Sequence, residues 1–260
     1  MVEQKRISMP LEKGSLILVD YTARVKDTND IFDTTQEEEA KKTNFYDPTH
    51  KYEPKIVSVG ESWVLKGLDD ALSNANVGDK LNIEVPPEKA FGKRDDTKIR
   101  MIPQRKLGDK ADEVGVGDEI EIDNRRGIVR YVGSGRIQVD FNHRFAGKTL
   151  LYDANVLKKL ESDSEKVSAL IKRRMGVDES KLQVNLAIPN LEIQLPDDTY
   201  LVEGLQIVKR AVANDIFKFI PEIKNIKFIE SYQAPAEQRK DEQQEQQQQP
   251  KVEATAEAKQ

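Results

Sequence analysis

The sequence contains no cysteine among its 260 residues, and its only histidines are His50 and His143. The missing thiols exclude disulfide bonds, thiol catalysis and metal sites built from cysteine. Two histidines in unrelated parts of the chain give little support to a histidine-rich zinc site or to a catalytic triad. We therefore expect neither a bound metal nor a cofactor.

Long apolar runs and nucleotide-binding motifs are also missing. No run approaches the roughly 18 apolar residues that indicate a membrane helix, and the first residues lack the apolar core of a signal peptide. Neither a GxxxxGK(S/T) motif nor a GxGxxG motif after a strand is present. The net charge of −5, with both signs mixed along the chain, disfavours nucleic acid as a partner. These absences predict a cytoplasmic protein with no membrane partner.

The first 161 residues carry apolar patterns typical of strands, and the pattern changes once, between about residues 96 and 142. The expected strands cover residues 15–25, 31–35, 55–59, 80–85 and 149–161. Ser62 is the expected N-cap of a helix that contains Val64, Leu65 and Leu68 on one face. Between about residues 96 and 142, three short strands joined by turns predict a separate small β unit.

The C-terminal part predicts a compact α+β domain of two helices and about three strands. One helix is expected over residues 163–174, and a longer one spans residues 200–220, with its start marked by Pro196 and Asp198. Apolar residues cover more than one side of the longer helix, which favours burial on more than one side. Homodimerisation through this domain is therefore a hypothesis. Residues 234–260 are glutamine-rich and nearly devoid of large apolar residues, which predicts a disordered tail.

An apolar and largely aromatic set of residues is the best candidate for a functional site. It gathers residues from the β-rich part of the chain, with one carboxylate among them: Tyr21, Phe32, Asp33, Trp63, Val64, Leu65, Leu68, Phe91, Phe145 and Tyr152. The set has no nucleophile–base pair, so it favours binding or desolvation over covalent chemistry. The alternative is plain packing, because aromatic residues on strands commonly belong to the core.

Five stretches in this part of the chain resemble FKBP-type peptidyl-prolyl isomerases, in the same order. They are DYTARV at 20–25, IFD at 31–33, SVGESWVLKGLDDAL at 58–72, VGDKLNIEVPPEKAFG at 77–92 and TLLYDANVLKKLE at 149–161. The resemblance covers about residues 7–95 and 142–161. NHRFAG at 142–147, with the unit inserted before it, is similar to the SlyD-type branch. Residues 34–54 and the C-terminal domain are similar to long archaeal members.

This resemblance implies an α+β fold with an FKBP-like antiparallel sheet wrapped on a short helix. The isomerase domain would comprise residues 1–95 and 142–161, with an inserted β chaperone domain at 96–141. A C-terminal α+β domain would follow at 162–233. The implied function is peptidyl-prolyl cis/trans isomerisation combined with chaperone activity. The partners would be unfolded or partly folded polypeptides that contain X–Pro bonds, captured by the insert and isomerised in an apolar pocket.

The resemblance also assigns places in that pocket. Trp63, Val64 and Leu65 would supply a backbone donor and an apolar wall, and Leu68 the floor. Phe32 and Asp33 match the family's Phe-Asp pair, while Tyr21 and Tyr152 match aromatic walls. Phe91 falls where many relatives have tyrosine, and the missing hydroxyl argues against macrolide binding more than against catalysis.

Two other functions stay open from the sequence. A chaperone that only binds its clients is the first, because Phe91 and Lys55 depart from the usual pocket. A factor associated with the ribosome or RNA is the second, because Arg125, Arg126 and Arg130 lie together in the insert.

Overall fold

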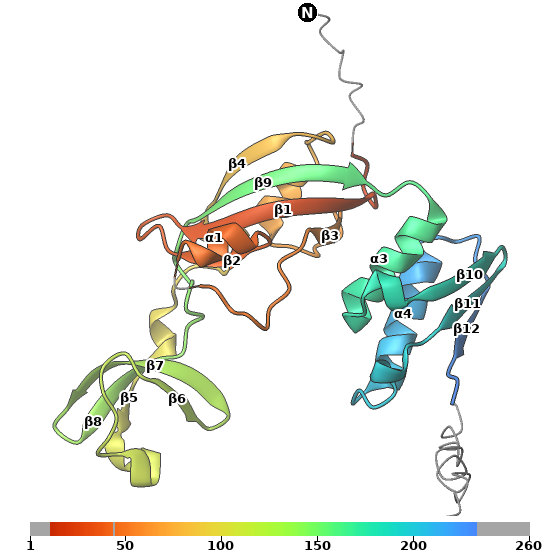
Figure 1. The fold of residues 1–260 in the computed structure, drawn as a ribbon. Helices are drawn as coiled ribbons and strands as arrows, with labels where there is room; N and C mark the ends of the chain where they lie inside the picture. Colours follow the sequence, from red (N-terminus) through yellow and green to blue (C-terminus); the bar gives the residue numbers. More distant parts are fainter. Residues whose placement is uncertain (1–10, 44, 233–260) are drawn as a thin grey trace, which may run out of the picture.

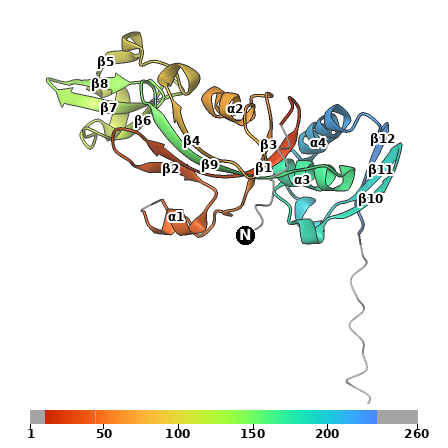
Figure 2. The same ribbon diagram turned by 90° about the horizontal axis from the view of Figure 1, so that it is seen from above.

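A computed structural model describes residues 11–43 and 45–232 of the protein and shows three units, each built on its own sheet (Figure 1). The N-terminal unit contains the long strands β1 (Leu16–Val25) and β9 (Leu150–Lys159). The inserted unit lies at one end of these strands, and the C-terminal unit lies at the other end (Figure 2). The expected α+β architecture, with a β insert and a C-terminal α+β domain, is confirmed.

The N-terminal unit is an antiparallel sheet in the order β2-β1-β9-β4. Strand β3 pairs with the first half of β1, and β2 pairs with its second half. Its remaining elements are β2 (Ile31–Thr34), α1 (Glu37–Lys41), β3 (Lys55–Ser58), α2 (Lys66–Leu72) and β4 (Lys80–Val85). Odd-numbered residues of β1, such as Ile17 and Val19, point to one face and are buried with Leu68 and Leu72 of α2. The alternating apolar residues of β1 therefore form the face of the sheet that α2 covers.

Helix α2 begins later than its sequence pattern predicted. Ser62 has a φ of +56° and is not the N-cap, because the helix starts at Lys66. The buried carboxylate of Asp69 accepts hydrogen bonds from the backbone N–H groups of Gly60 (2.7 Å) and Ser62 (3.0 Å). These bonds hold the chain before the helix in a turn. Val64 and Leu65 consequently lie ahead of the helix rather than on its face.

The inserted unit is a four-stranded antiparallel sheet in the order β5-β8-β7-β6. Its strands are β5 (Ile99–Pro103), β6 (Glu119–Ile122), β7 (Arg125–Gly133) and β8 (Arg136–Asp140). The sequence indicated three strands, and β5 is the additional one. This short edge strand ends in Pro103, so its pattern is weak. The core is small, because only five apolar side chains are buried in it: Ile102, Ile122, Val129, Ile137 and Val139.

Polar contacts fix the place where the chain enters and leaves the insert. The buried Asp140 forms ion pairs with Arg94, on the entering segment, and with Arg130 of β7. Burial raises the pKa of Asp140, but hydrogen bonds from Asn142 and the charge of Arg94 outweigh it and lower that pKa. Asn142 also exchanges two hydrogen bonds with the backbone of Asp95, at 3.0 and 2.9 Å. The two crossing segments are therefore held side by side.

The C-terminal unit packs two helices on a three-stranded sheet in the order β10-β11-β12. Its elements are α3 (Asp163–Met175), β10 (Gln183–Ala187), β11 (Asn190–Gln194), α4 (Leu205–Phe219) and β12 (Asn225–Ile229). Helix α4 starts five residues later than the expected residue 200, because Gly204 adopts a left-handed φ of +75° immediately before it. Leu201, within the expected range of the helix, is 97% exposed and lies outside it.

The N-terminal and C-terminal units share an apolar cluster. Leu16, on the β1 face turned away from α2, is buried in the core of the C-terminal unit, and Leu18, Ile56 and Trp63 pack against that core. An ion pair of 2.8 Å between Lys172 of α3 and Glu53 adds a polar contact. One strand therefore supplies side chains to two cores.

The predicted tail over residues 234–260 lies outside the described residues. Within residues 11–43 and 45–232, none of the helices has both the length and the apolar character needed to cross a membrane.

Gly67, in the first turn of α2, lies so close to β4 that it has no space for a side chain. A Cβ atom there would approach Val85 Cγ1 to 2.4 Å. We expect Gly67→Ala to lower the free energy of unfolding by about 1–3 kcal/mol, because overpacking must push α2 off the sheet. Gly115→Ala is the control, since its Cβ would meet only Asp118 at an ordinary 3.7 Å. Urea denaturation of both variants measures the difference, and equal stabilities would contradict this account of the packing.

Candidate active site

The structure brings the whole candidate set around one cavity. All ten candidate residues, from Tyr21 to Tyr152, line a cavity of about 300 Å³ between α2, the sheet and the segment 142–147. Lys55, His143 and Arg144 complete its lining. Neither His143 nor Arg144 was among the candidate site residues predicted from the sequence. Their only signal was their position next to Phe145 in the NHRFAG segment.

The aromatic rings form a continuous series along the cavity wall. Tyr21 lies 5.7 Å from Tyr152, between ring centroids, and Phe32 meets Tyr152 edge-on at 6.2 Å. Phe32 also contacts Phe145 at 4.6 Å, and Phe145 lies 5.6 Å from Phe91. Edge-on and tilted contacts of this kind stabilise aromatic clusters beyond simple burial. The rings therefore make a preformed apolar wall from five separate segments of the chain.

A hydrogen-bonded polar group occupies one corner of the cavity. The Tyr21 hydroxyl donates to Asp33 Oδ2 at 2.6 Å and accepts from Lys55 Nζ at 3.0 Å. Burial and the adjacent Asp33 carboxylate raise the pKa of Tyr21, so its phenol stays protonated at neutral pH. These bonds fix the orientation of Tyr21 and engage its only proton. Tyr21 consequently contributes its ring, rather than a free donor, to the cavity.

The hydroxyl of Tyr152 differs in having no hydrogen bond to any other described residue. Burial and the Asp33 charge also raise the pKa of Tyr152, so this phenol keeps its proton as well. Because Tyr152 lines the cavity, its O–H group can donate to a bound molecule. Tyr152 thus offers a hydroxyl donor to the cavity, whereas Phe91 on the same wall has no hydroxyl.

His143 lies at the rim and stacks on Phe91, with ring centroids 4.0 Å apart and planes inclined by 13°. Its Nδ1 accepts a hydrogen bond from the Phe145 backbone N–H at 3.3 Å. Burial, followed by the charge of Arg144, lowers the pKa of His143. The ring is therefore neutral at pH 7, the state in which Nδ1 can accept this bond.

Trp63 reaches beyond the cavity to the C-terminal unit. Its ring meets Phe219 of α4 edge-on, with centroids 5.4 Å apart, and the Arg173 guanidinium of α3 lies 3.7 Å from its centroid. The sequence placed Trp63 at a helix start. Only the packing of the C-terminal unit revealed that two of its helices hold this side chain.

Comparison with family models agrees with this arrangement. The model described as FKBP-type peptidyl-prolyl cis-trans isomerase matches residues 8–107, the model described as FKBP26, IF domain matches residues 101–145, and the model described as FKBP26_C-terminal matches residues 163–233.

Individual relatives agree as well. The chain is 32% identical over 155 residues to a short-type peptidyl-prolyl cis-trans isomerase of Methanocaldococcus jannaschii, covering 60% of this chain and 98% of the relative. It is 26% identical over 156 residues to an FKBP-type 16 kDa peptidyl-prolyl cis-trans isomerase of Escherichia coli, covering 58% of this chain and 95% of the relative. A SlyD isomerase of Pasteurella multocida is 29% identical over 113 residues, which are 42% of this chain and 56% of that protein.

The fold and the aromatic cavity thus place the chain in the class of proline isomerases. The chain belongs to the FKBP-type peptidyl-prolyl cis-trans isomerase family and carries an insert of the IF type. Its substrates are polypeptides that contain prolyl bonds.

Protonation of His143 should weaken substrate binding. In the folded protein its pKa lies below the ordinary 6.5, so the Nδ1 hydrogen bond is intact above pH 6.5 and is lost as pH falls through the lowered pKa. A hydrogen bond contributes about 0.5–1.5 kcal/mol, so we expect KM to rise roughly threefold to tenfold across this range. His143→Phe keeps an aromatic ring beside Phe91 but cannot titrate, and its KM should not vary with pH. A wild-type KM that stays flat over the pH range in which NMR shows His143 to titrate would refute this role.

Proposed function

We propose that the aromatic cavity holds the proline ring of a client polypeptide and removes water from the preceding carbonyl. Rotation about a peptide bond costs roughly 18–20 kcal/mol because the amide loses conjugation. The twisted amide is less polar than the planar one, so a dry apolar cavity favours it relative to water. About 4 kcal/mol of such differential binding accelerates rotation roughly a thousandfold. The observation that carries the proposal is the convergence of ten residues from separate segments, nine of them apolar or aromatic, on one cavity.

The polar groups of the cavity would orient the bound amide. Tyr152 carries a protonated hydroxyl without a partner among the described residues, and it can donate to a carbonyl of the client. Asp33 and Lys55 hold the Tyr21 ring in place through its hydroxyl. Catalysis would not need the hydroxyl that Phe91 lacks, and no proton would be transferred in the rate-limiting rotation.

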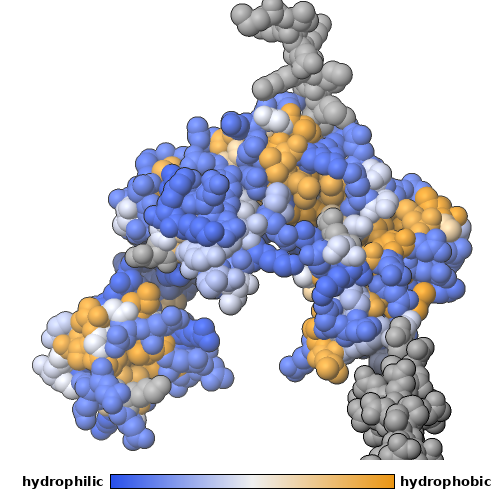
Figure 3. Space-filling view, viewed as in Figure 1, coloured by the Kyte–Doolittle hydropathy of each residue, from blue (hydrophilic) through white to orange (hydrophobic). Residues whose placement is uncertain are grey.

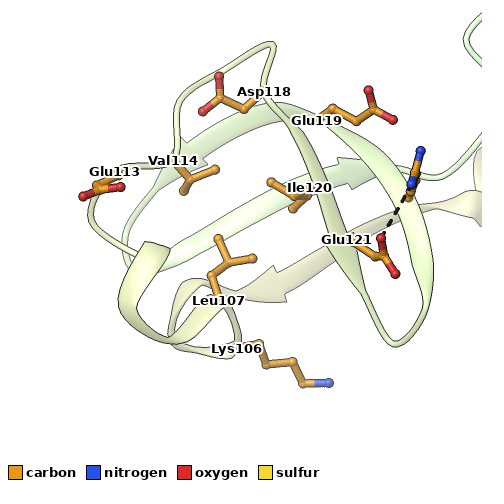
Figure 4. A pocket seen from close by; sticks show the side chains of 9 residues that line it. Lys106, Leu107, Glu113, Val114, Asp118, Glu119, Ile120 and Glu121 are labelled. Atoms are coloured by element: carbon orange, nitrogen blue, oxygen red, sulfur yellow. Dashed lines mark ion pairs between the residues drawn. The ribbon is translucent and has the colours of Figure 1, made fainter. Parts of the chain in front are cut away.

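The inserted unit would bind the unfolded client. It carries a groove of about 750 Å³, in which Leu107, Val114 and Ile120 point toward the middle (Figure 4). Four acidic side chains and two basic ones surround these apolar residues: Glu113, Asp118, Glu119, Glu121, Lys106 and Arg126. Apolar residues also gather on the surface of this unit in Figure 3. Such a surface suits an unfolded segment with apolar and basic side chains.

The expected division of the chain is part of the same proposal. Residues 1–95 and 142–161 would form the isomerase domain, residues 96–141 the chaperone domain, and residues 162–233 the C-terminal domain. Binding by the insert would raise the local concentration of prolyl bonds at the cavity. The alternative RNA-binding role gains no support from the insert. Arg126 pairs with Glu121, Arg130 pairs with Asp140, and Arg125 lies over the Phe141 ring.

Self-association through the C-terminal unit is a second proposal. On α4, Ile207 is 76% exposed and Phe217 is 40% exposed, and Val202 beside the helix is 49% exposed. Ile220, at the end of the expected helix, is buried in the unit's own core. The remaining exposed apolar residues would be covered by the same surface of a second copy.

Two substrates separate isomerisation from client binding. We expect a variant in which a Gly-Gly link replaces residues 96–141 to isomerise a prolyl tetrapeptide within about threefold of the full-length rate, because the junction at Asp95 and Asn142 is already closed by hydrogen bonds. On proline-limited refolding of a whole protein, the same variant should be about a hundredfold less active than the full-length protein. Without the insert, the client is no longer concentrated beside the cavity. Equal losses on both substrates would contradict the division of roles.

Phe32→Ala in the full-length chain is the matched control for this experiment. It opens the aromatic wall while leaving the insert intact, so we expect roughly tenfold or greater loss of kcat/KM on the tetrapeptide. A tetrapeptide rate unaffected by Phe32→Ala, or undetectable in the wild type, would favour a chaperone that only binds.

Sedimentation equilibrium at tens of micromolar tests self-association. We expect a dimer for the wild type and a monomer for Ile207→Glu, because a charge at the centre of an apolar interface stays unpaired. Lys224→Glu, at an exposed position outside the helix, is the control and should stay dimeric. A wild-type protein that sediments as a monomer would rule out the proposal.

A further inference from the structure

A second cavity adjoins the aromatic cavity on the side of the C-terminal unit. Its volume is about 480 Å³, and it shares Tyr21, Asp33, Lys55 and Trp63 with the aromatic cavity. Its lining also includes two apolar residues of the first sheet, Leu18 and Ile56, and two basic residues of α3, Lys172 and Arg173. We call this cavity the interdomain groove. A polypeptide held in the aromatic cavity has the groove directly beside it.

The packing between the two units holds the groove in shape. Leu18, Ile56 and Trp63 pack against the C-terminal core, so the apolar floor is backed by buried side chains from both units. The ion pair between Lys172 and Glu53 joins the rims at 2.8 Å. A preformed groove costs a bound chain less ordering of the protein than a surface that must close. The groove exists only because the C-terminal unit is docked.

Arg173 is the cation in the groove whose charge is least neutralised. Lys51, Lys55 and Lys172 each pair with a carboxylate of their own: Asp178 at 3.6 Å, Asp33 at 4.0 Å and Glu53 at 2.8 Å. Arg173 instead lies 3.6 Å from Asp215, which Arg174 already binds through two hydrogen bonds of 2.7 and 3.1 Å. Two guanidinium groups thus share one carboxylate. Like-charge crowding of this kind favours a further anion.

The Arg173 side chain also lies mostly out of bulk solvent, beside the aromatic cavity. Its guanidinium covers the Trp63 ring at 3.7 Å, and its side chain is only 26% exposed. The planar group can bind a carboxylate with two parallel hydrogen bonds, and the stacked ring limits its freedom. Because Trp63 lines both cavities, an acidic side chain bound to Arg173 would lie within a few residues of the proline.

We propose that the interdomain groove binds the client segment next to the prolyl bond and that Arg173 selects an acidic side chain in that segment. This inference rests on the proposed prolyl site in the aromatic cavity. It gives the C-terminal unit a part in substrate selection, because α3 supplies the selecting residue. The two binding surfaces then have opposite preferences. The insert groove is rimmed mainly by carboxylates, and the groove beside the aromatic cavity offers a guanidinium.

Peptides that differ only in charge test the proposal with the full-length protein. Each peptide has one alanyl-prolyl bond, with two glutamates or two glutamines placed either before or after it. At low salt we expect one of the glutamate peptides to show about fivefold higher kcat/KM than its glutamine partner. The ratio should fall toward one at high salt and in Arg173→Gln. Arg210→Gln removes an exposed arginine of α4 that does not line the groove, and it should keep the ratio.

Peptide affinity provides a readout that does not depend on turnover. Trp63 is the only tryptophan, so quenching of its fluorescence reports binding at this place alone. Equal affinities and rates for both charge types, or a preference that persists in Arg173→Gln, would overturn the inference. Glutamine peptides that bind beside Trp63 without being isomerised would instead count against the proposed prolyl site. In that case the affinity ratio between glutamate and glutamine peptides still decides the role of Arg173.

Discussion

The pairing of β1 with three other strands is the constraint on which the rest of the molecule depends. Antiparallel bonds to β2, β3 and β9 hold β1 extended along its full length, so its side chains must alternate between two faces. One face delivers Ile17, Val19 and Tyr21 to α2 and the aromatic cavity. The other face delivers Leu16 and Leu18 to the C-terminal unit. A shift of this strand by one residue would exchange both sets and remove the cavity together with the interface.

The chemistry of the isomerase suits a site that is built from packing. Twisting an amide needs neither a base nor a nucleophile, which is consistent with a cavity lined mostly by rings and aliphatic side chains. Several ionisable groups instead hold other parts of the site in position. Asp33 and Lys55 hold the Tyr21 hydroxyl, and Asp69 holds the turn that presents Val64 and Leu65. In the proposed mechanism, preorganised walls of this kind would favour a twisted amide because they need not rearrange when it forms.

The sequence allowed most of the strands to be predicted and named ten residues that line one cavity. Its predictions were wrong where local patterns compete with tertiary contacts. Ser62 has the side chain of an N-cap, but the Asp69 carboxylate binds the backbone before α2 and delays the helix to Lys66. The second helix of the C-terminal unit was expected from residue 200, yet Gly204 adopts a left-handed conformation and α4 begins at Leu205. The roles of His143 and Arg144 could not be predicted, because nothing nearby in the sequence marks a cavity rim.

The class of fold and the family could be predicted from the sequence, since strand alternation and motif order are local properties that can be recognised without coordinates. The tertiary structure alone decided what lies next to what. The stacking of His143 on Phe91 and the contact of Trp63 with Arg173 and Phe219 join segments far apart in the chain. Such contacts depend on how three separately patterned units dock, and no periodicity within one unit encodes the face that its neighbour will cover.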